Sequence, residues 1–239
     1  MTEIEIDRRN LLSAGAALGA AAAFAVSAGP ALADVASAPA RPTYAPQPVP
    51  LPYDPKAIPG LSEKLLTSHH ANNYTGAVKR IAAISSQLAA LDPATAPSFQ
   101  LNGLKREELI ATNSMILHEL YFANLGSAGA ASAGLAAMIT RDFGSQARWQ
   151  AEFSGMGKAL GGGSGWVVLQ FNHRDNRLIN QWANDHTMSL AGGTPILVLD
   201  MFEHAYAMDY GSKAPAYVDA VMAALNWNAA NSRFAKAAG

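Results

Sequence analysis

The chain has 239 residues and a formal net charge of −1 at pH 7, with 15% charged residues. A balance so close to neutral offers no general attraction for nucleic acid or for an anionic membrane surface, so we expect neither as a partner. The chain has no cysteine, which excludes disulfides and thiolate metal sites. Any metal would have to be held by histidine, aspartate or glutamate.

Residues 1–33 have the pattern of an export signal. Arg8 and Arg9 stand side by side before an Ala/Gly-rich run, and Ala31-Leu32-Ala33 offers a small-residue cleavage site. The paired arginines are typical of the twin-arginine route, which predicts a periplasmic protein. A retained membrane anchor is the alternative, but the run from Ser13 to Ala28 is short and weakly apolar for a span of about 20 residues. We therefore expect cleavage, and no stable membrane association afterwards.

Residues 34–59 contain eight of the 13 prolines in the chain. Proline lacks a backbone N–H and resists both helix and sheet, so this stretch predicts a semi-rigid linker. The remaining chain, of about 180 residues, is long enough for one domain with a proper core.

Residues 60–126 are expected to form a helical hairpin. Apolar residues recur at steps of three and four from Leu61 to about Leu91, which indicates an amphipathic helix. A second helical pattern runs from Lys105 to Leu125. Turn-forming residues from Asp92 to Leu104 predict the connection between the two helices.

Residues 127–239 are expected to complete the same unit as an α/β region. Two β-prone runs at 165–171 and 177–182 flank a polar turn, which predicts a hairpin. The other expected elements are two or three short helices within 127–160, a third strand at 195–199 and one closing helix at 217–234. The predicted fold class is α+β, with a small three-stranded antiparallel sheet.

Four segments, in chain order, resemble the motifs of the iron/manganese superoxide dismutase family. They are Ser62 to His69, Asn113 to Leu125 around His118, Gly163-Ser164-Gly165-Trp166, and Asp200-Met201-Phe202-Glu203-His204-Ala205-Tyr206, which resembles D-x-[WF]-E-H-A-[YF]. The likeness spans about residues 51 to 234. It implies that the protein converts two superoxide anions to dioxygen and hydrogen peroxide by cycling one Mn or Fe ion per subunit.

The resemblance also implies which residues bind the metal: His69, His118, Asp200 and His204. Adjacent helical residues point about 100° apart, so His69 and its neighbour His70 cannot both face the interior. A carboxylate at the end of a buried strand, such as Asp200, is costly unless it is paired or binds a metal. Three nitrogens and one oxygen suit a first-row metal and leave a position for solvent or substrate.

Further roles follow from the same resemblance. Trp166 would line the metal pocket, and Glu203 would cross a subunit interface to the last histidine ligand of the partner. Tyr206 matches an interface aromatic, so a homodimer or homotetramer is expected. His186 resembles a histidine variant of the residue that hydrogen-bonds the metal's solvent; the alternative is an idle loop histidine in a polar run.

Two departures from the family pattern affect proton supply. The family has a histidine four residues and a tyrosine eight residues after the first ligand, whereas this chain has Asn73 and Ala77. Tyr74 is the candidate substitute, although its phenol could reach the substrate channel only through a local shift. Ser114 stands where iron enzymes usually carry glutamine, which leaves the choice between iron and manganese open.

Two alternatives to a dismutase remain at this point. One is an exported metal-binding protein of the same fold without dismutase turnover, and the other is a different metal-dependent oxidoreductase, because fold does not fix function. If the substrate is superoxide, local cations would have to attract it, with Lys79 and Arg80 as candidates. His173, in the predicted hairpin turn, is expected to be exposed and idle.

Overall fold

The computed structural model describes residues 41–239, which belong to one compact unit, Ala40–Gly239. The expected export signal and residues 34–40 of the expected linker lie outside the described residues. No helix within 41–239 combines the length and the apolar character that crossing a membrane requires.

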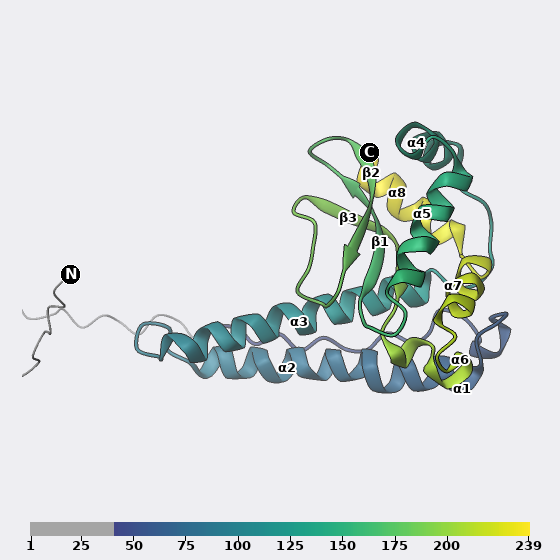
Figure 1. Cartoon of the computed structure of the whole chain (residues 1–239). Helices are drawn as coiled ribbons and strands as arrows, with labels where there is room; N and C mark the ends of the chain where they lie inside the picture. Colours follow the sequence, from purple (N-terminus) through teal and green to yellow (C-terminus); the bar gives the residue numbers. More distant parts are fainter. Residues whose placement is uncertain (1–40) are drawn as a thin grey trace, which may run out of the picture. The chain divides into compact units, whose positions relative to one another are not determined.

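A long helical hairpin forms the N-terminal half, as expected. Its first arm consists of α1 (Glu63–Ser68), the π-helix η2 (His69–Tyr74) and α2 (Thr75–Ala90), and its second arm is α3 (Ser98–Ala123). Figure 1 shows α2 and α3 lying side by side along their length. The buried side chains of α2 recur at helical spacing and form the seam: Ala77, Val78, Ile81, Ile84, Ser85 and Leu88.

The second arm begins earlier than predicted. Helix α3 starts at Ser98 instead of Lys105, so the turn residues expected at 98–104 are helical. Asn102 and Gly103 weaken the helical pattern there, but Leu101 and Leu104 pack against the core. Tertiary packing therefore outweighs the low helix propensity of this turn.

The described part of the expected linker is bound to the hairpin. Residues 41–52, which we call the strap, run along it in Figure 1, and the 3₁₀-helix η1 (Pro55–Ala57) follows. Four hydrogen bonds connect the strap to the hairpin: Arg41 Nη2 to Glu108 Oε1 at 2.7 Å, Tyr44 N to Ser85 Oγ at 2.7 Å, Val49 N to the Tyr74 hydroxyl at 2.8 Å, and His70 Nε2 to Val49 O at 2.8 Å. This segment is therefore part of the folded unit.

The C-terminal half begins with two helices, which confirms the expectation for residues 127–160. They are α4 (Ala133–Phe143) and α5 (Gln146–Ala159). A serine precedes each helix and accepts a hydrogen bond from the backbone three residues on, as an N-cap does.

Three antiparallel strands follow in the order β2-β1-β3. They are β1 (Trp166–Asn172), β2 (Arg177–Ala183) and β3 (Gly193–Asp200), so the α+β fold is confirmed. The central strand β1 is buried along its whole length. Its first residue, Trp166, pairs with Asp200, the last residue of β3, and this register brings two candidate site residues together.

The end of the chain is more broken than predicted. After the 3₁₀-helix η3 (Glu203–Ala205) come α6 (Ala207–Tyr210), α7 (Ala214–Ala223) and α8 (Trp227–Ala238). The expectation of one closing helix at 217–234 was wrong, because Leu225 forms a β-bridge with Leu125. The backbone N–H of Asn226 donates to Asn124 O at 2.6 Å, and its side chain caps α8.

A half-buried guanidinium connects the hairpin to the C-terminal half. Arg233 on α8 donates to Asn124 Oδ1 and to Ile196 O, both at 2.5 Å. Asn124 in turn donates its side-chain N–H to Val198 O at 2.9 Å. Burial lowers the pKa of Arg233 to about 10, so it stays charged at neutral pH. The end of α3 is thereby fixed to β3 and α8.

Candidate metal centre

Four side chains from distant parts of the chain meet at one point. They are His69 from η2, His118 from α3, Asp200 from the end of β3 and His204 from η3. One ligand atom from each lies within 4.8 Å of the others. Three are buried, and the His204 side chain keeps 27% exposure, so the cluster is enclosed on all sides but one.

The facing atoms in this cluster have no hydrogen-bond partner among the described residues. Asp200 Oδ2 lies 3.1 Å from His69 Nε2, 3.6 Å from His118 Nε2 and 3.4 Å from His204 Nε2. All four atoms are buried without a hydrogen bond. Unpaired buried polar atoms are costly and rare, and four of them converging on one point fit a shared cation. The residues present therefore fit a mononuclear metal ion.

Hydrogen bonds to the backbone orient two of these side chains. His118 donates Nδ1–H to Ser114 O at 2.6 Å, which leaves Nε2 free with its lone pair toward the cluster. Asp200 uses Oδ1 to accept from Phe202 N at 2.9 Å, which leaves Oδ2 free. Such supporting hydrogen bonds fix the tautomer and orientation of ligands in metal sites.

The protonation states also suit a cation. Burial lowers the pKa of His69, and it lowers that of His118 to about 3, so both imidazoles are neutral at neutral pH. Burial acts to raise the pKa of Asp200, but its interactions with His204 and His69 outweigh burial and hold the pKa well below its usual range. Neutral imidazoles beside a carboxylate are the states that metal binding requires.

His186 and Trp166 form one wall of the cluster. The indole N–H of Trp166 donates to His186 Nδ1 at 2.8 Å, so the proton of this neutral imidazole sits on Nε2. The His186 ring stacks on Phe202 with ring centres 4.7 Å apart, and it lies 6.4 Å from the His118 ring. Burial is the main cause that lowers the pKa of His186. Both residues lie where the sequence motifs led us to expect them.

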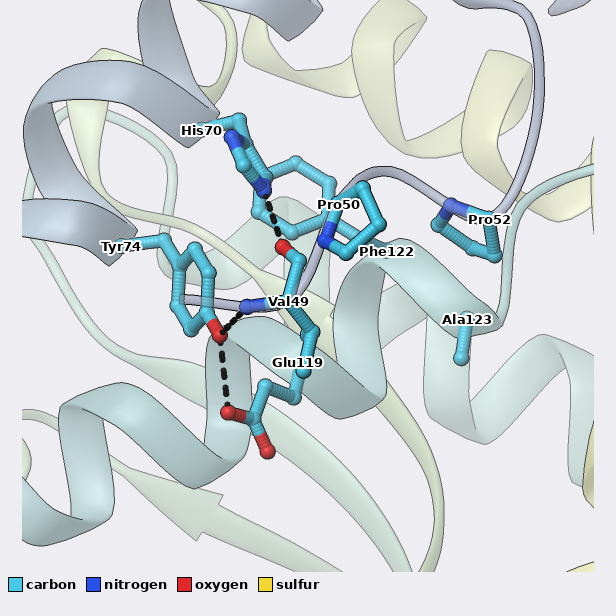
Figure 2. A pocket seen from close by; sticks show the side chains of 8 residues that line it. All are labelled: Val49, Pro50, Pro52, His70, Tyr74, Glu119, Phe122 and Ala123. Atoms are coloured by element: carbon cyan, nitrogen blue, oxygen red, sulfur yellow. Dashed lines mark hydrogen bonds between the residues drawn. The ribbon is translucent and has the colours of Figure 1, made fainter. Parts of the chain in front are cut away.

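Tyr74 is not brought to the cluster. Its hydroxyl donates to Glu119 Oε1 at 2.9 Å and accepts from Val49 N at 2.8 Å, and all three residues line a cavity of about 260 Å³ (Figure 2). The Phe122 ring lies 5.0 Å from His69 and 6.4 Å from Tyr74. The geometry therefore does not support Tyr74 as a proton relay in the channel.

The other candidates lie at the periphery. Glu203 is exposed, whereas Tyr206 is buried and accepts from Gly162 N at 3.4 Å. Arg80 forms an ion pair with Glu107, and its charge helps to lower the pKa of His186. Lys79 and His173 are exposed, and His173 Nε2 lies 2.7 Å from Thr194 Oγ1.

Two buried tyrosines next to the cluster were not expected to contribute to it. Tyr217 donates its hydroxyl to Asp200 O at 2.7 Å, so it accepts the 3.1 Å hydrogen bond from the Tyr121 hydroxyl. This chain of hydroxyls supports the backbone of Asp200 from behind. The aromatic position three residues after His118 in the second motif was the available signal for Tyr121.

Comparison with known proteins gives a consistent assignment. A family model described as "Iron/manganese superoxide dismutases, C-terminal domain" matches residues 131–233. "Superoxide dismutase [Fe]" of Cupriavidus metallidurans is 64% identical over 188 residues, which cover 79% of this chain and 95% of that protein. "Superoxide dismutase [Mn] 1" of Halobacterium salinarum is 35% identical over 193 residues, which cover 79% and 94%. The chain therefore belongs to the iron/manganese superoxide dismutase family.

Proposed function

We propose that the protein is a superoxide dismutase that holds one Fe or Mn ion per subunit. The observation that carries the proposal is the convergence of four unpaired, buried ligand atoms, in a chain of this family. The ligands are His69, His118, Asp200 and His204. The reaction takes two superoxide anions and two protons and yields dioxygen and hydrogen peroxide.

The bound ion supplies a redox couple that takes an electron from one superoxide and returns it to a second. The protein sets the potential of that couple through one carboxylate and three imidazoles. Asp200 supplies the single negative charge of the ligand set, and its low pKa keeps that charge in place over the physiological range. The tyrosine pair behind Asp200 holds its backbone, and Ser114 holds His118.

His186 is the residue proposed to hydrogen-bond solvent or substrate at the open position of the site. Its Nδ1 is occupied by the Trp166 indole N–H, so Nε2–H is the donor available to an oxygen atom. A donor aimed at an anion or a developing oxyanion in a largely desolvated site stabilises it strongly. Asn73 and Ala77 provide no imidazole or phenol, so the protons for peroxide are proposed to come from solvent at the open position of the site.

Subunit association and location are further parts of the proposal. Glu203 is an exposed carboxylate directly beside the half-buried ligand His204, which suits a hydrogen bond to the partner's ligand in a homodimer. Replacing Glu203 with alanine should then weaken both association and metal retention, as seen by ultracentrifugation and metal analysis. Export to the periplasm rests on the twin-arginine pattern in residues 1–33.

Dismutation by the full chain, loaded separately with iron and manganese, tests the proposed function. About one ion per subunit with rapid superoxide removal supports it and identifies the working metal. Full occupancy without turnover overturns it, and favours a metal-binding protein or another oxidoreductase. The control is His118→Ala, which should lose metal and activity together, alongside the exposed His173→Ala, which should lose neither.

A further inference from the structure

We propose that the strap, residues 41–52, positions the first metal ligand. The backbone N–H and C=O of Val49 hold the π-helical turn η2 that carries His69, and this restraint strengthens metal binding. The inference rests on the proposed metal site, and it assigns a binding role to a segment that its proline content alone marks as a linker.

The turn that needs support is unusual. A π-helix is rare and occurs mostly as a single turn inside an α-helix, and η2 interrupts the run between α1 and α2. Side chains make further hydrogen bonds to backbone carbonyls in and beside this turn. Asn72 Nδ2 donates to Ser68 O at 2.9 Å, and Thr75 Oγ1 donates to His70 O at 3.0 Å. These side-chain hydrogen bonds stabilise the chain locally where η2 departs from α-helical geometry.

Val49 holds the same turn from outside. Its N–H donates to the Tyr74 hydroxyl at 2.8 Å, and its C=O accepts from His70 Nε2 at 2.8 Å (Figure 2). Tyr74 ends η2, and His70 directly follows His69. The backbone N–H and C=O of one residue thus hold two side chains of the turn, and Tyr74 also hydrogen-bonds to Glu119, the neighbour of the ligand His118.

These hydrogen bonds hold the strap on the hairpin, because side-chain packing between the strap and the hairpin is incomplete. The cavity of about 260 Å³ lies between the strap and the hairpin, and Val49, Pro50 and Pro52 form its outer wall (Figure 2). Val49 itself is 50% exposed. Its side chain buries too little surface to fix the strap, so the polar contacts to His70 and Tyr74 determine its position.

The rest of the strap helps to hold Val49 in position beside η2. Prolines at 42, 46, 48, 50 and 52 restrict the backbone before folding, so little conformational entropy is lost when the strap docks. The Tyr44 N–H bond to Ser85 Oγ anchors it further along α2. That anchor lies away from η2, which makes it a matched control.

The test is Tyr74→Phe, which removes both hydroxyl hydrogen bonds and keeps the buried ring. Ser85→Ala removes one strap anchor away from the metal. In the full chain, we expect Tyr74→Phe to release iron or manganese to a chelator about tenfold faster, and to change the electron paramagnetic resonance spectrum of the bound metal. Ser85→Ala should lower the melting temperature without either change.

Two more variants separate positioning from proton transfer. Glu119→Gln keeps an oxygen that can accept from Tyr74, so metal release should match that of the unchanged protein. His70→Phe keeps an aromatic ring against Phe122 but loses the bond to Val49 O, so it should release metal faster even if Tyr74→Phe does not fold. Loss of turnover in Glu119→Gln with normal metal release would assign a separate proton-transfer role to Glu119 and support the positioning role of the strap, whereas metal release as fast as in Tyr74→Phe would overturn the proposal.

Lower melting temperatures for Tyr74→Phe and His70→Phe, with unchanged metal release and spectra, would also overturn it, because the strap would then be only structural. Metal release and the metal spectrum are read without any dismutase assay. A protein that binds metal but lacks turnover would therefore contradict the proposed function while leaving the strap's role open to the same measurement.

Discussion

The indole N–H of Trp166 donates to His186 Nδ1 at 2.8 Å, and this bond fixes which nitrogen of His186 carries its proton. Trp166 can do so because it opens β1, opposite Asp200 in the sheet. The first residue of β1 thus sets the tautomer of an imidazole in the loop between β2 and β3.

Replacing Trp166 with phenylalanine should lower kcat/KM for dismutation about tenfold without removing the metal, because such supporting bonds typically contribute that much to activity. Stopped-flow decay of superoxide measures the effect. Trp149→Phe is the matched control, since Trp149 is equally buried and donates its indole N–H to Asn180 Oδ1 at 3.1 Å, away from the site. Equal losses in the two variants would show that general destabilisation explains the result.

The metal-free protein should lose stability as the pH falls. The pKa of folded His118 is about 3, below the ordinary 6.5, so the unfolded chain binds more protons between these values. Stability is then highest above pH 6.5 and decreases toward acid, and the lowered pKa of Asp200 acts in the same direction below its ordinary 3.8. Thermal unfolding of metal-free protein at about pH 7.5 and about pH 5 measures this. A melting temperature that is flat across the window would contradict it.

Arg233→Met should lower the free energy of unfolding by about 2 to 4 kcal/mol, because Asn124 Oδ1 and Ile196 O would lose their donor. Lys236→Met on the same helix is exposed and should stay within about 0.5 kcal/mol. Chemical denaturation followed by circular dichroism compares them. Similar values for both would mean that solvent replaces the guanidinium at no cost.

Gly165→Ala should destabilise the fold by at least about 3 kcal/mol or prevent soluble expression. A Cβ atom at this position would lie 2.1 Å from Ala183 O, and the backbone φ is +144°. Gly155 lies on the exposed face of α5, and a Cβ atom added there would contact no neighbouring group within 4 Å. Gly155→Ala should instead stabilise the fold by about 0.5 to 1 kcal/mol. Yield and melting temperature of the two variants decide the matter, and a well-folded Gly165→Ala protein would refute the expected clash.

The sequence predicts the cluster well, because its members carry local motifs. The Asp200 to Tyr206 segment, the helix around His118 and the Ser62 to His69 segment indicated the candidate ligands, and short β-prone runs predicted the three strands. The structure brings the four candidate ligands together at one point.

What the sequence did not predict depends on contacts between distant segments. The break at Leu225 follows from its bridge to Leu125, and the early start of α3 follows from the packing of Leu101 and Leu104. The directions of the side chains after His69 also do not follow α-helical spacing. The π-helix η2 turns each later residue by roughly 100° from its α-helical direction. Tyr74 therefore faces Glu119 and Val49, a placement that residue spacing alone could not reveal.

The cluster draws His69 and His118 from the hairpin and Asp200 and His204 from the last part of the chain, with α4, α5, β1 and β2 between them in sequence. A hairpin has mostly local contacts and can form early, whereas β3 and η3 must dock on it before the second pair of ligands arrives. A chain still emerging from the ribosome offers only two imidazoles, which bind a divalent ion weakly. Metal capture is therefore a late event that reports completed assembly of both halves.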